Sequence, residues 1–154
     1  FMEKIKLEKL NKNCIYGAIG VTQHDDFGLR KGYKTTFTIT WGHILQGNND
    51  FNFREYGKKF LCKKNVDTLD CCCLMIHSSL IKKYCLRFDE NLSFHMYAED
   101  LCYSAKLIHK IQSKVVPMKC FHMGTGNLDE EFFKSSNYLK EKFHIDRIPS
   151  TCKN

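Results

Sequence analysis

Two adjacent carboxylates, Glu99 and Asp100, open a helix-like segment that follows an aromatic, histidine-bearing stretch; together they read FHMYAEDLCYSAKLI (residues 94–108). Acidic side chains in the first turn of a helix interact favourably with its unpaired N–H groups and its dipole, by about 0.3 to 1 kcal/mol. A carboxylate can also act as a general base if it reaches a substrate hydroxyl and its pKa lies near the working pH. Taken alone, the pair is more typical of helix capping than of catalysis. The surrounding sequence is needed to distinguish the two roles.

The segments around this pair alternate between strand-like and helix-like patterns. The predicted strands are residues 15–21, 34–45, 69–76 and 114–118, and the predicted helices are 2–11, 78–84, 99–110 and a segment that begins at 129–131. The run 69–76 is apolar enough to predict a strand with both faces covered by helices. Leu101, Ala105 and Ile108 recur with the period of an amphipathic helix. This alternation predicts an α/β layered fold.

Length and composition indicate one compact domain, because the chain has 154 residues of which 43% are hydrophobic. We assign it to residues 1–147 and read 148–154 as a frayed tail. No apolar run reaches the roughly 18 to 20 residues of a membrane span. Nine cysteines, three of them consecutive and none in a C-x-x-C pair, favour a reduced cytosolic setting over disulfides or structural zinc.

A formal net charge of +7 favours an anionic partner, such as a phosphorylated molecule, a membrane surface or a nucleic acid. The basic residues are scattered and form no nucleic-acid-binding pattern, so we expect no nucleic-acid partner. Residues 23–33 contain the acidic pair Asp25 and Asp26 after His24, and we interpret them as a loop.

The order of these features resembles the C-terminal, acceptor-side half of the family-2 nucleotide-sugar glycosyltransferases of GT-A fold. Three pieces carry the resemblance: VDTLDCCCLMIHSSLI (66–81), LRFDENLSFHMYAEDLCYSAKLI (86–108) and KVVPMKCFHMGTG (114–126). The segment IYGAIGV (15–21) also looks like the strand before the acceptor region in part of that family. The resemblance implies a partial GT-A-like layered domain, with a mixed, mostly parallel sheet flanked by helices.

The same resemblance implies roles for individual residues. Asp100 matches the aspartate that takes the proton of the acceptor hydroxyl, and Glu99 matches its supporting neighbour. His122 matches a histidine that completes a divalent metal site, for Mg²⁺ or Mn²⁺, or touches the diphosphate of the donor. The substrate-binding candidates are Asp70, Asp67, His95, Tyr97 and Trp41, with His43 beside Trp41 as an equally open case.

The resemblance therefore predicts an inverting glycosyltransferase of polysaccharide biosynthesis, or its acceptor-side portion. It would move a sugar from a nucleotide-diphosphate donor to a hydroxyl of a glycan or lipid-linked acceptor, in the cytoplasm or at the inner face of the membrane. The family's nucleotide-binding half, with its Asp-x-Asp metal motif, would precede residue 15 and is not in these residues. We expect the isolated chain to bind nucleotides weakly and to be inactive alone. The alternative is a non-catalytic α/β domain that presents a basic surface to an anionic partner.

Overall fold

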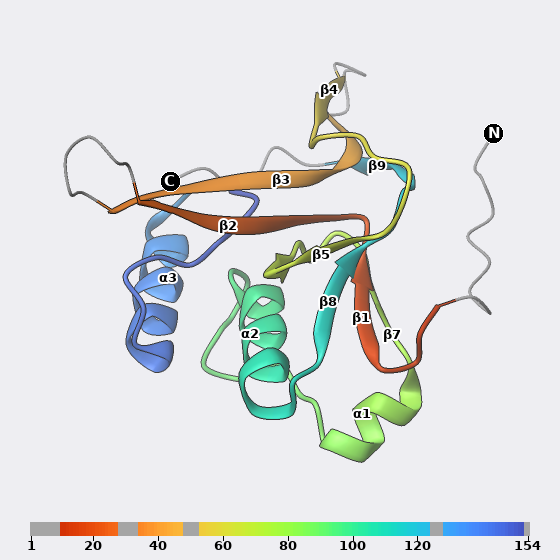
Figure 1. Ribbon diagram of the computed structural model, residues 1–154. Helices are drawn as coiled ribbons and strands as arrows, with labels where there is room; N and C mark the ends of the chain where they lie inside the picture. The colour runs from red at the N-terminus through yellow and green to blue at the C-terminus, as the bar shows by residue number, and fades with distance from the viewer. Residues whose placement is uncertain (1–9, 28–33, 48–52, 124–127, 153–154) are drawn as a thin grey trace.

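The computed structural model describes residues 10–27, 34–47, 53–123 and 128–152 (Figure 1). Its strands are β1 (Cys14–Gly17), β2 (Ile19–Phe27), β3 (Lys34–Gly47), β4 (Phe53–Tyr56), β5 (Lys64–Val66), β6 (Thr68–Leu69), β7 (Leu74–Ile76), β8 (Gln112–Val115) and β9 (Lys119–Met123). Its helices are α1 (Ser78–Tyr84), α2 (Tyr97–His109) and α3 (Glu130–Phe143). The predicted helix at 2–11 lies almost wholly outside the described residues.

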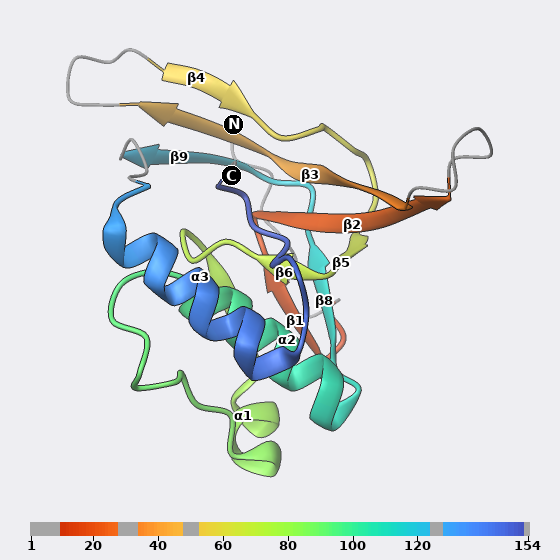
Figure 2. The ribbon, with the colours of Figure 1, turned by 90° about the vertical axis from the view of Figure 1, so that its left-hand side faces the viewer.

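The strands form two sheets. The smaller sheet has the order β5-β8-β1-β7, and the larger has the order β4-β3-β2-β6, with β9 paired to β3. Figure 1 shows the long pair of β2 and β3 extending above the helices, with the smaller sheet below it and α1 at the opposite end. In Figure 2, α3 lies in front of α2, and the chain that follows α3 rises past β6.

The prediction of a mixed, mostly parallel sheet flanked by helices is wrong. Within the described residues only the pairs β1/β8 and β3/β9 are parallel, whereas β1/β7, β2/β3, β2/β6, β3/β4 and β5/β8 are antiparallel. Parallel neighbours need a long crossover, usually through a helix, whereas antiparallel neighbours need only a short turn. Nine strands share three helices here, so most connections in the described part of the chain are too short for crossovers.

The predicted strand at 69–76 accounts for part of that error. It divides into β6 and β7, which belong to different sheets, with a turn at Cys71 and Cys72 between them. An Asp70 oxygen accepts a hydrogen bond from the backbone N–H of Cys72 at 2.8 Å, which is the local side-chain bond that competes with a strand ladder. The run is apolar because cysteines and a methionine fill it, but β7 is only partly buried.

Other segments follow the sequence more closely. The predicted strand at 34–45 is β3, and the predicted helices at 78–84, 99–110 and from 129 are α1, α2 and α3. The predicted strand at 15–21 is interrupted at Ala18, and β2 continues through residues 23–27, which we had interpreted as loop. Side chains of Asp25 and Asp26 lie outside what the structure describes.

Two apolar clusters hold the helices in place. One joins α2 to the smaller sheet and contains Ile15, Val66, Leu69, Leu80, Leu86, Leu101, Cys102, Ala105, Ile111 and Val115. The other joins α3 to the approach of α2 and to the C-terminal residues, and it contains Leu92, Met96, Phe132, Leu139 and Ile148. Phe132 and Leu139 are both fully buried. The start of α2 is thus fixed from both sides.

A close approach between β2 and β6 sets the position of Asp70, which follows β6 directly. A Cβ atom added at Gly20 would lie 2.5 Å from the backbone oxygen of Thr68, so only glycine fits there. The backbone N–H of Asp70 in turn donates to the carbonyl of Ile19 at 3.1 Å. These contacts hold Asp70 next to the first turn of α2.

Candidate functional site

Glu99 and Asp100 lie in the first turn of α2, as predicted. The N-cap residue Met96 has a left-handed backbone and makes no side-chain capping bond. The helix begins here because Leu101, Cys102 and its other apolar residues bury one face in the core. That packing draws both carboxylates inward, where the exposed fraction is 7% for Glu99 and 2% for Asp100.

Glu99 is a buried carboxyl group whose hydrogen-bond donor is a hydroxyl. The Oγ of Ser150 donates to its Oε1 at 2.7 Å. Burial raises the pKa of Glu99 from 4.5 to about 7, and the nearby charge of Asp70 adds to that increase. A shift of that size corresponds to about 3 kcal/mol, which exceeds the 0.3 to 1 kcal/mol that a helix dipole offers a carboxylate. Burial therefore decides the protonation of Glu99, and the group titrates near neutral pH.

Asp100 has a different partner. Its Oδ1 accepts a hydrogen bond from the Nζ of Lys142 at 2.6 Å, and the same Nζ lies 2.6 Å from an oxygen of Asp89. The hydroxyl of Tyr138 also donates to Asp89 at 2.8 Å. Burial raises the pKa of Asp100, although the ammonium group of Lys142 acts in the opposite direction. Hydrogen bonds from Lys142 and from the backbone N–H of Asn91 hold the pKa of Asp89 well below its usual range. Asp100 therefore anchors α3 to α2 through a shared lysine.

We expect replacement of Lys142 with methionine to lower the free energy of unfolding by about 2 kcal/mol at pH 7. Loss of one partner of a fully buried ion pair costs about 3 to 5 kcal/mol, and the partial exposure of Lys142 reduces that figure. Urea unfolding at pH 7 measures the loss. The matched control is Lys134→Met, because Lys134 forms an exposed pair with Glu130 on the same helix. Equal small losses in both variants would contradict the anchoring role.

Residues 148–152, which we call the C-terminal strap, cover this site. Ile148 is only 2% exposed and Pro149 is fully buried. The hydroxyl of Thr68 donates to the carbonyl of Pro149 at 2.6 Å, and the hydroxyl of Thr151 donates to Asp70. The predicted frayed tail is therefore a packed segment, because two apolar residues anchor its beginning and two hydroxyl groups bind carboxylates beyond them.

Tyr97 and Asp70, two predicted substrate-binding residues, join Glu99 in this cluster. A hydrogen bond with the Cys71 thiol and burial together raise the pKa of Tyr97 to about 12. Its ring meets Phe88 edge to face, at 5.3 Å between ring centres. Burial also raises the pKa of the Cys71 thiol, which makes it a poor nucleophile. The cluster is suited to binding hydroxyl groups and to proton transfer.

The remaining predicted substrate-binding residues have other partners. Asp67 accepts from the Nζ of Lys106 at 2.6 Å and from the backbone N–H of Gln23 at 2.8 Å. The Nε2 of His95 lies 3.1 Å from Asp129, the N-cap of α3, so this histidine supports the start of that helix.

Trp41 lies on β3 with a different set of contacts. Its Nε1 donates to the hydroxyl of Thr22 at 3.1 Å, and its ring meets Phe60 edge to face. The neighbouring candidate His43 bonds Glu55 at 3.2 Å on the same sheet. These contacts account for both residues as parts of the larger sheet.

His122 lies on β9, opposite Gln46 of β3. Residues 124–127, which follow β9, lie outside the described residues. Among the residues that the structure describes, no three His, Cys, Asp or Glu side chains are placed to share a metal ion. The Mg²⁺ or Mn²⁺ ion that the resemblance implies stays a prediction, and no step below is assigned to a metal.

No match to the chain was found among protein-family models, curated proteins or solved structures. Across the described helices, none is long and apolar enough to cross a membrane. Any proposal of function therefore rests on the geometry of the site.

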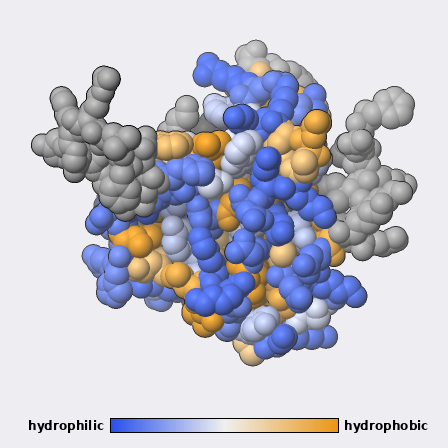
Figure 3. Space-filling view, in the orientation of Figure 1, coloured by the Kyte–Doolittle hydropathy of each residue, from blue (hydrophilic) through white to orange (hydrophobic). Residues whose placement is uncertain are grey.

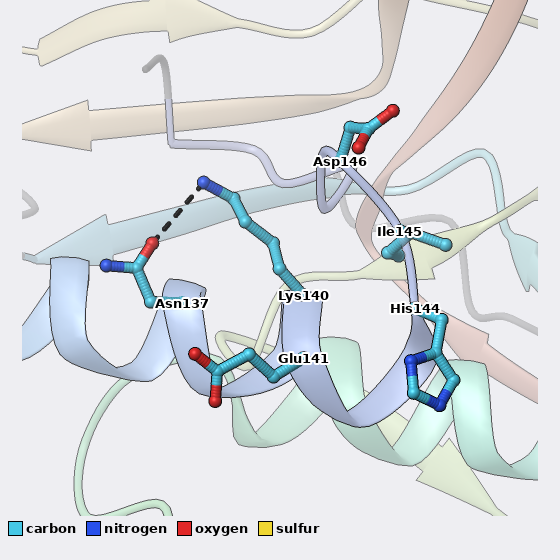
Figure 4. Close-up of a pocket in the computed structure, with 6 residues that line it drawn as sticks. All are labelled: Asn137, Lys140, Glu141, His144, Ile145 and Asp146. Carbon is cyan, nitrogen blue, oxygen red and sulfur yellow. Dashed lines mark hydrogen bonds between the residues drawn. The ribbon is translucent and has the colours of Figure 1, made fainter.

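One surface hollow of the described residues lies away from this site. It is a shallow depression of about 510 Å³, lined by Asn137, Lys140, Glu141, His144, Ile145 and Asp146 (Figure 4). Its side chains come from the end of α3 and the residues that follow, and none was predicted to act in catalysis.

Three residues of the site were missed from the sequence: Lys142, Ser150 and Thr151. Lys142 lies in the last turn of a helix, where a lysine is common and does not stand out. Ser150 and Thr151 were placed in the tail. The apolar pair Ile148 and Pro149 immediately before them was the one available signal that this tail is anchored.

Proposed function

We propose that this chain is the acceptor-side portion of an inverting glycosyltransferase, in which a carboxylate at the start of α2 takes the proton of the acceptor hydroxyl. One observation carries the proposal: the buried Glu99, with a pKa of about 7, already accepts a hydrogen bond from a hydroxyl at 2.7 Å. A general base needs such a pKa near the working pH and a hydroxyl within about 2.6 to 3.2 Å. The resemblance of residues 66–126 to family-2 glycosyltransferases supports the same chemistry.

The reaction is a single displacement. A carboxylate oxygen of the base takes the proton of the acceptor O–H, and the acceptor oxygen forms a bond to the anomeric carbon of the donor sugar. The bond from that carbon to the nucleotide diphosphate breaks, and the diphosphate leaves with the electron pair. Attack from the face opposite the leaving group inverts the anomeric centre.

The roles within the pair are exchanged relative to the sequence-based prediction. The resemblance assigns the base to Asp100, but one oxygen of Asp100 is engaged by Lys142 at 2.6 Å. An ammonium partner stabilises the ionised carboxylate and weakens it as a base. Glu99 has a hydroxyl partner instead, so we assign the base to Glu99 and a positioning role to Asp100. Tyr97 and Asp70 are the acceptor-binding candidates beside it.

The test is a transfer assay on the longest natural reading frame that contains these residues. It is incubated with Mg²⁺ or Mn²⁺, a panel of nucleotide-diphosphate sugars and glycan or lipid-linked acceptors. We expect transfer with the anomeric configuration opposite to that of the donor, which NMR of the product identifies. Products with retained configuration would contradict the mechanism. A frame that encodes no nucleotide-binding half and transfers no sugar would contradict the proposal itself.

A binding domain without catalysis is the second candidate, and one surface favours it. The Nζ atoms of Lys58 and Lys64 each lie 5.2 Å from the centre of the Trp41 ring. In Figure 3, hydrophilic side chains cover much of one face of the molecule, with hydrophobic ones among them. The two ammonium groups beside Trp41 can attract anions, in a chain whose formal net charge is +7. If a Lys58→Ala/Lys64→Ala variant loses binding to anionic vesicles while no frame transfers sugar, this candidate replaces the first.

A further inference from the structure

We propose that the C-terminal strap is an internal mimic of the acceptor, whose Ser150 and Thr151 hydroxyls occupy the positions that two hydroxyls of a sugar take. The inference rests on the proposed function and adds to it a substrate class and a means of competition. An acceptor can reach Glu99 only after residues 150–152 are displaced.

The hydrogen bonds of the strap support the mimicry. The Ser150 hydroxyl donates to Glu99 Oε1 at 2.7 Å, within the range that a general base needs for an acceptor hydroxyl. The hydroxyl of the next residue, Thr151, donates to Asp70. Two consecutive hydroxyl groups therefore bind two carboxylates that come from different parts of the fold, Glu99 from α2 and Asp70 from the turn after β6.

The fully buried part of the strap is its beginning. Ile148 belongs to the apolar cluster of Phe132 and Leu139, and Pro149 is fully buried and receives the hydrogen bond of Thr68. Beyond Pro149 the side chains are only partly buried, and that of Cys152 packs against the same apolar cluster. Because the fully buried residues precede Ser150, residues 150–152 can leave the carboxylates, with loss of the Cys152 contact, while Ile148 and Pro149 stay in place.

The arrangement selects a class of acceptor. A simple alcohol can replace only one of the two strap hydroxyls, and it would leave the other carboxylate without its donor. A sugar ring carries several hydroxyls and can offer one to each carboxylate. We therefore expect the acceptor group to be a sugar, not the lone hydroxyl of a lipid alcohol.

Competition of this kind lowers the apparent affinity for the acceptor in proportion to the fraction of molecules in which the strap is open. The double variant Ser150→Ala/Thr151→Val removes both donors and is expected to bind methyl glycosides at least ten-fold more tightly than the unaltered chain. Thr68→Val removes the hydrogen bond to the Pro149 carbonyl and alters neither carboxylate. It should also make glycoside binding tighter. The matched control is Ser93→Ala, because Ser93 also donates to a carboxylate, Glu131 at 3.2 Å, outside the strap.

Calorimetric titration with methyl glucoside, methyl galactoside and methyl mannoside measures the affinities, with cyclohexanol as the probe that has a single hydroxyl. Hydrogen exchange of the full chain then follows the amides of residues 150–152, which should exchange faster when a glycoside is bound. Equal glycoside affinities in the double variant, Thr68→Val and the unaltered chain would overturn the mimicry and leave the proposed function standing. An equal gain in affinity for cyclohexanol would contradict the requirement for an acceptor with two hydroxyl groups. If no glycoside binds any form, the proposed function fails and this inference with it.

Discussion

Replacement of Glu99 with glutamine is expected to lower the rate of sugar transfer by about 10² to 10⁴-fold, the usual contribution of a general base. Glutamine has nearly the shape of glutamate and can still accept the Ser150 hydrogen bond, so the strap and the fold should persist. It cannot take up a proton, so the acceptor oxygen must attack without assistance. Turnover with saturating donor and acceptor, measured on the longest natural reading frame, reports the loss.

The matched comparison is Asp100→Asn, one residue further along the same helix turn. We expect a loss of less than about ten-fold in turnover, because Asn keeps a hydrogen bond to Lys142 and only the orientation of α3 changes. A larger loss for Asp100→Asn than for Glu99→Gln would return the base to Asp100, where the family resemblance places it. Unaltered transfer in both variants would exclude a catalytic role for this pair.

The free energy of unfolding is expected to fall by about 3 kcal/mol between pH 4.5 and pH 7 through Glu99 alone, because the pKa of this group rises from 4.5 in the unfolded chain to about 7 in the fold. Below pH 4.5 the carboxyl group is protonated in both states and contributes no difference. As the pH rises, the unfolded chain loses the proton first and gains stability relative to the fold. Above pH 7 both states are ionised, and the loss is complete.

This dependence is obtained as a difference between two proteins. Urea unfolding of the wild type and of Glu99→Gln at several pH values gives the contribution of Glu99, while those of Asp89, Asp100 and other groups cancel. The matched control is Glu131→Gln, at an exposed position on α3, and it should keep the pH dependence of the wild type. Parallel curves for the wild type and Glu99→Gln would show that burial does not raise the pKa of Glu99.

Several elements could be predicted because their patterns are local. Alternating threonine, aromatic and aliphatic residues predicted β3, and Leu101 with Ala105 predicted the buried face of α2. The acidic residues at 129–131 marked the start of α3. These signals depend on residues within one or two turns of each other, so no tertiary information was needed.

The strand pairing could not be predicted in this way. The residues 69–76 have the composition of a buried strand, but the Asp70 side chain turns the chain within that run. His122 lies on β9 because β3 extends far enough to pair with it, which no pattern near His122 indicates. Pairing depends on which strands meet after folding, and composition constrains this only weakly.

The sequence by itself determined that a helix with one buried face begins with two acidic residues, Glu99 and Asp100. Only the tertiary structure decided which partner each one has. The partner of Asp100 is 42 residues away and that of Glu99 is 51 residues away, so neither pairing leaves a local pattern. The proposed division of roles rests on those partners, because the ammonium group of Lys142 opposes the rise that burial gives the pKa of Asp100, whereas burial beside a hydroxyl raises the pKa of Glu99 to about 7.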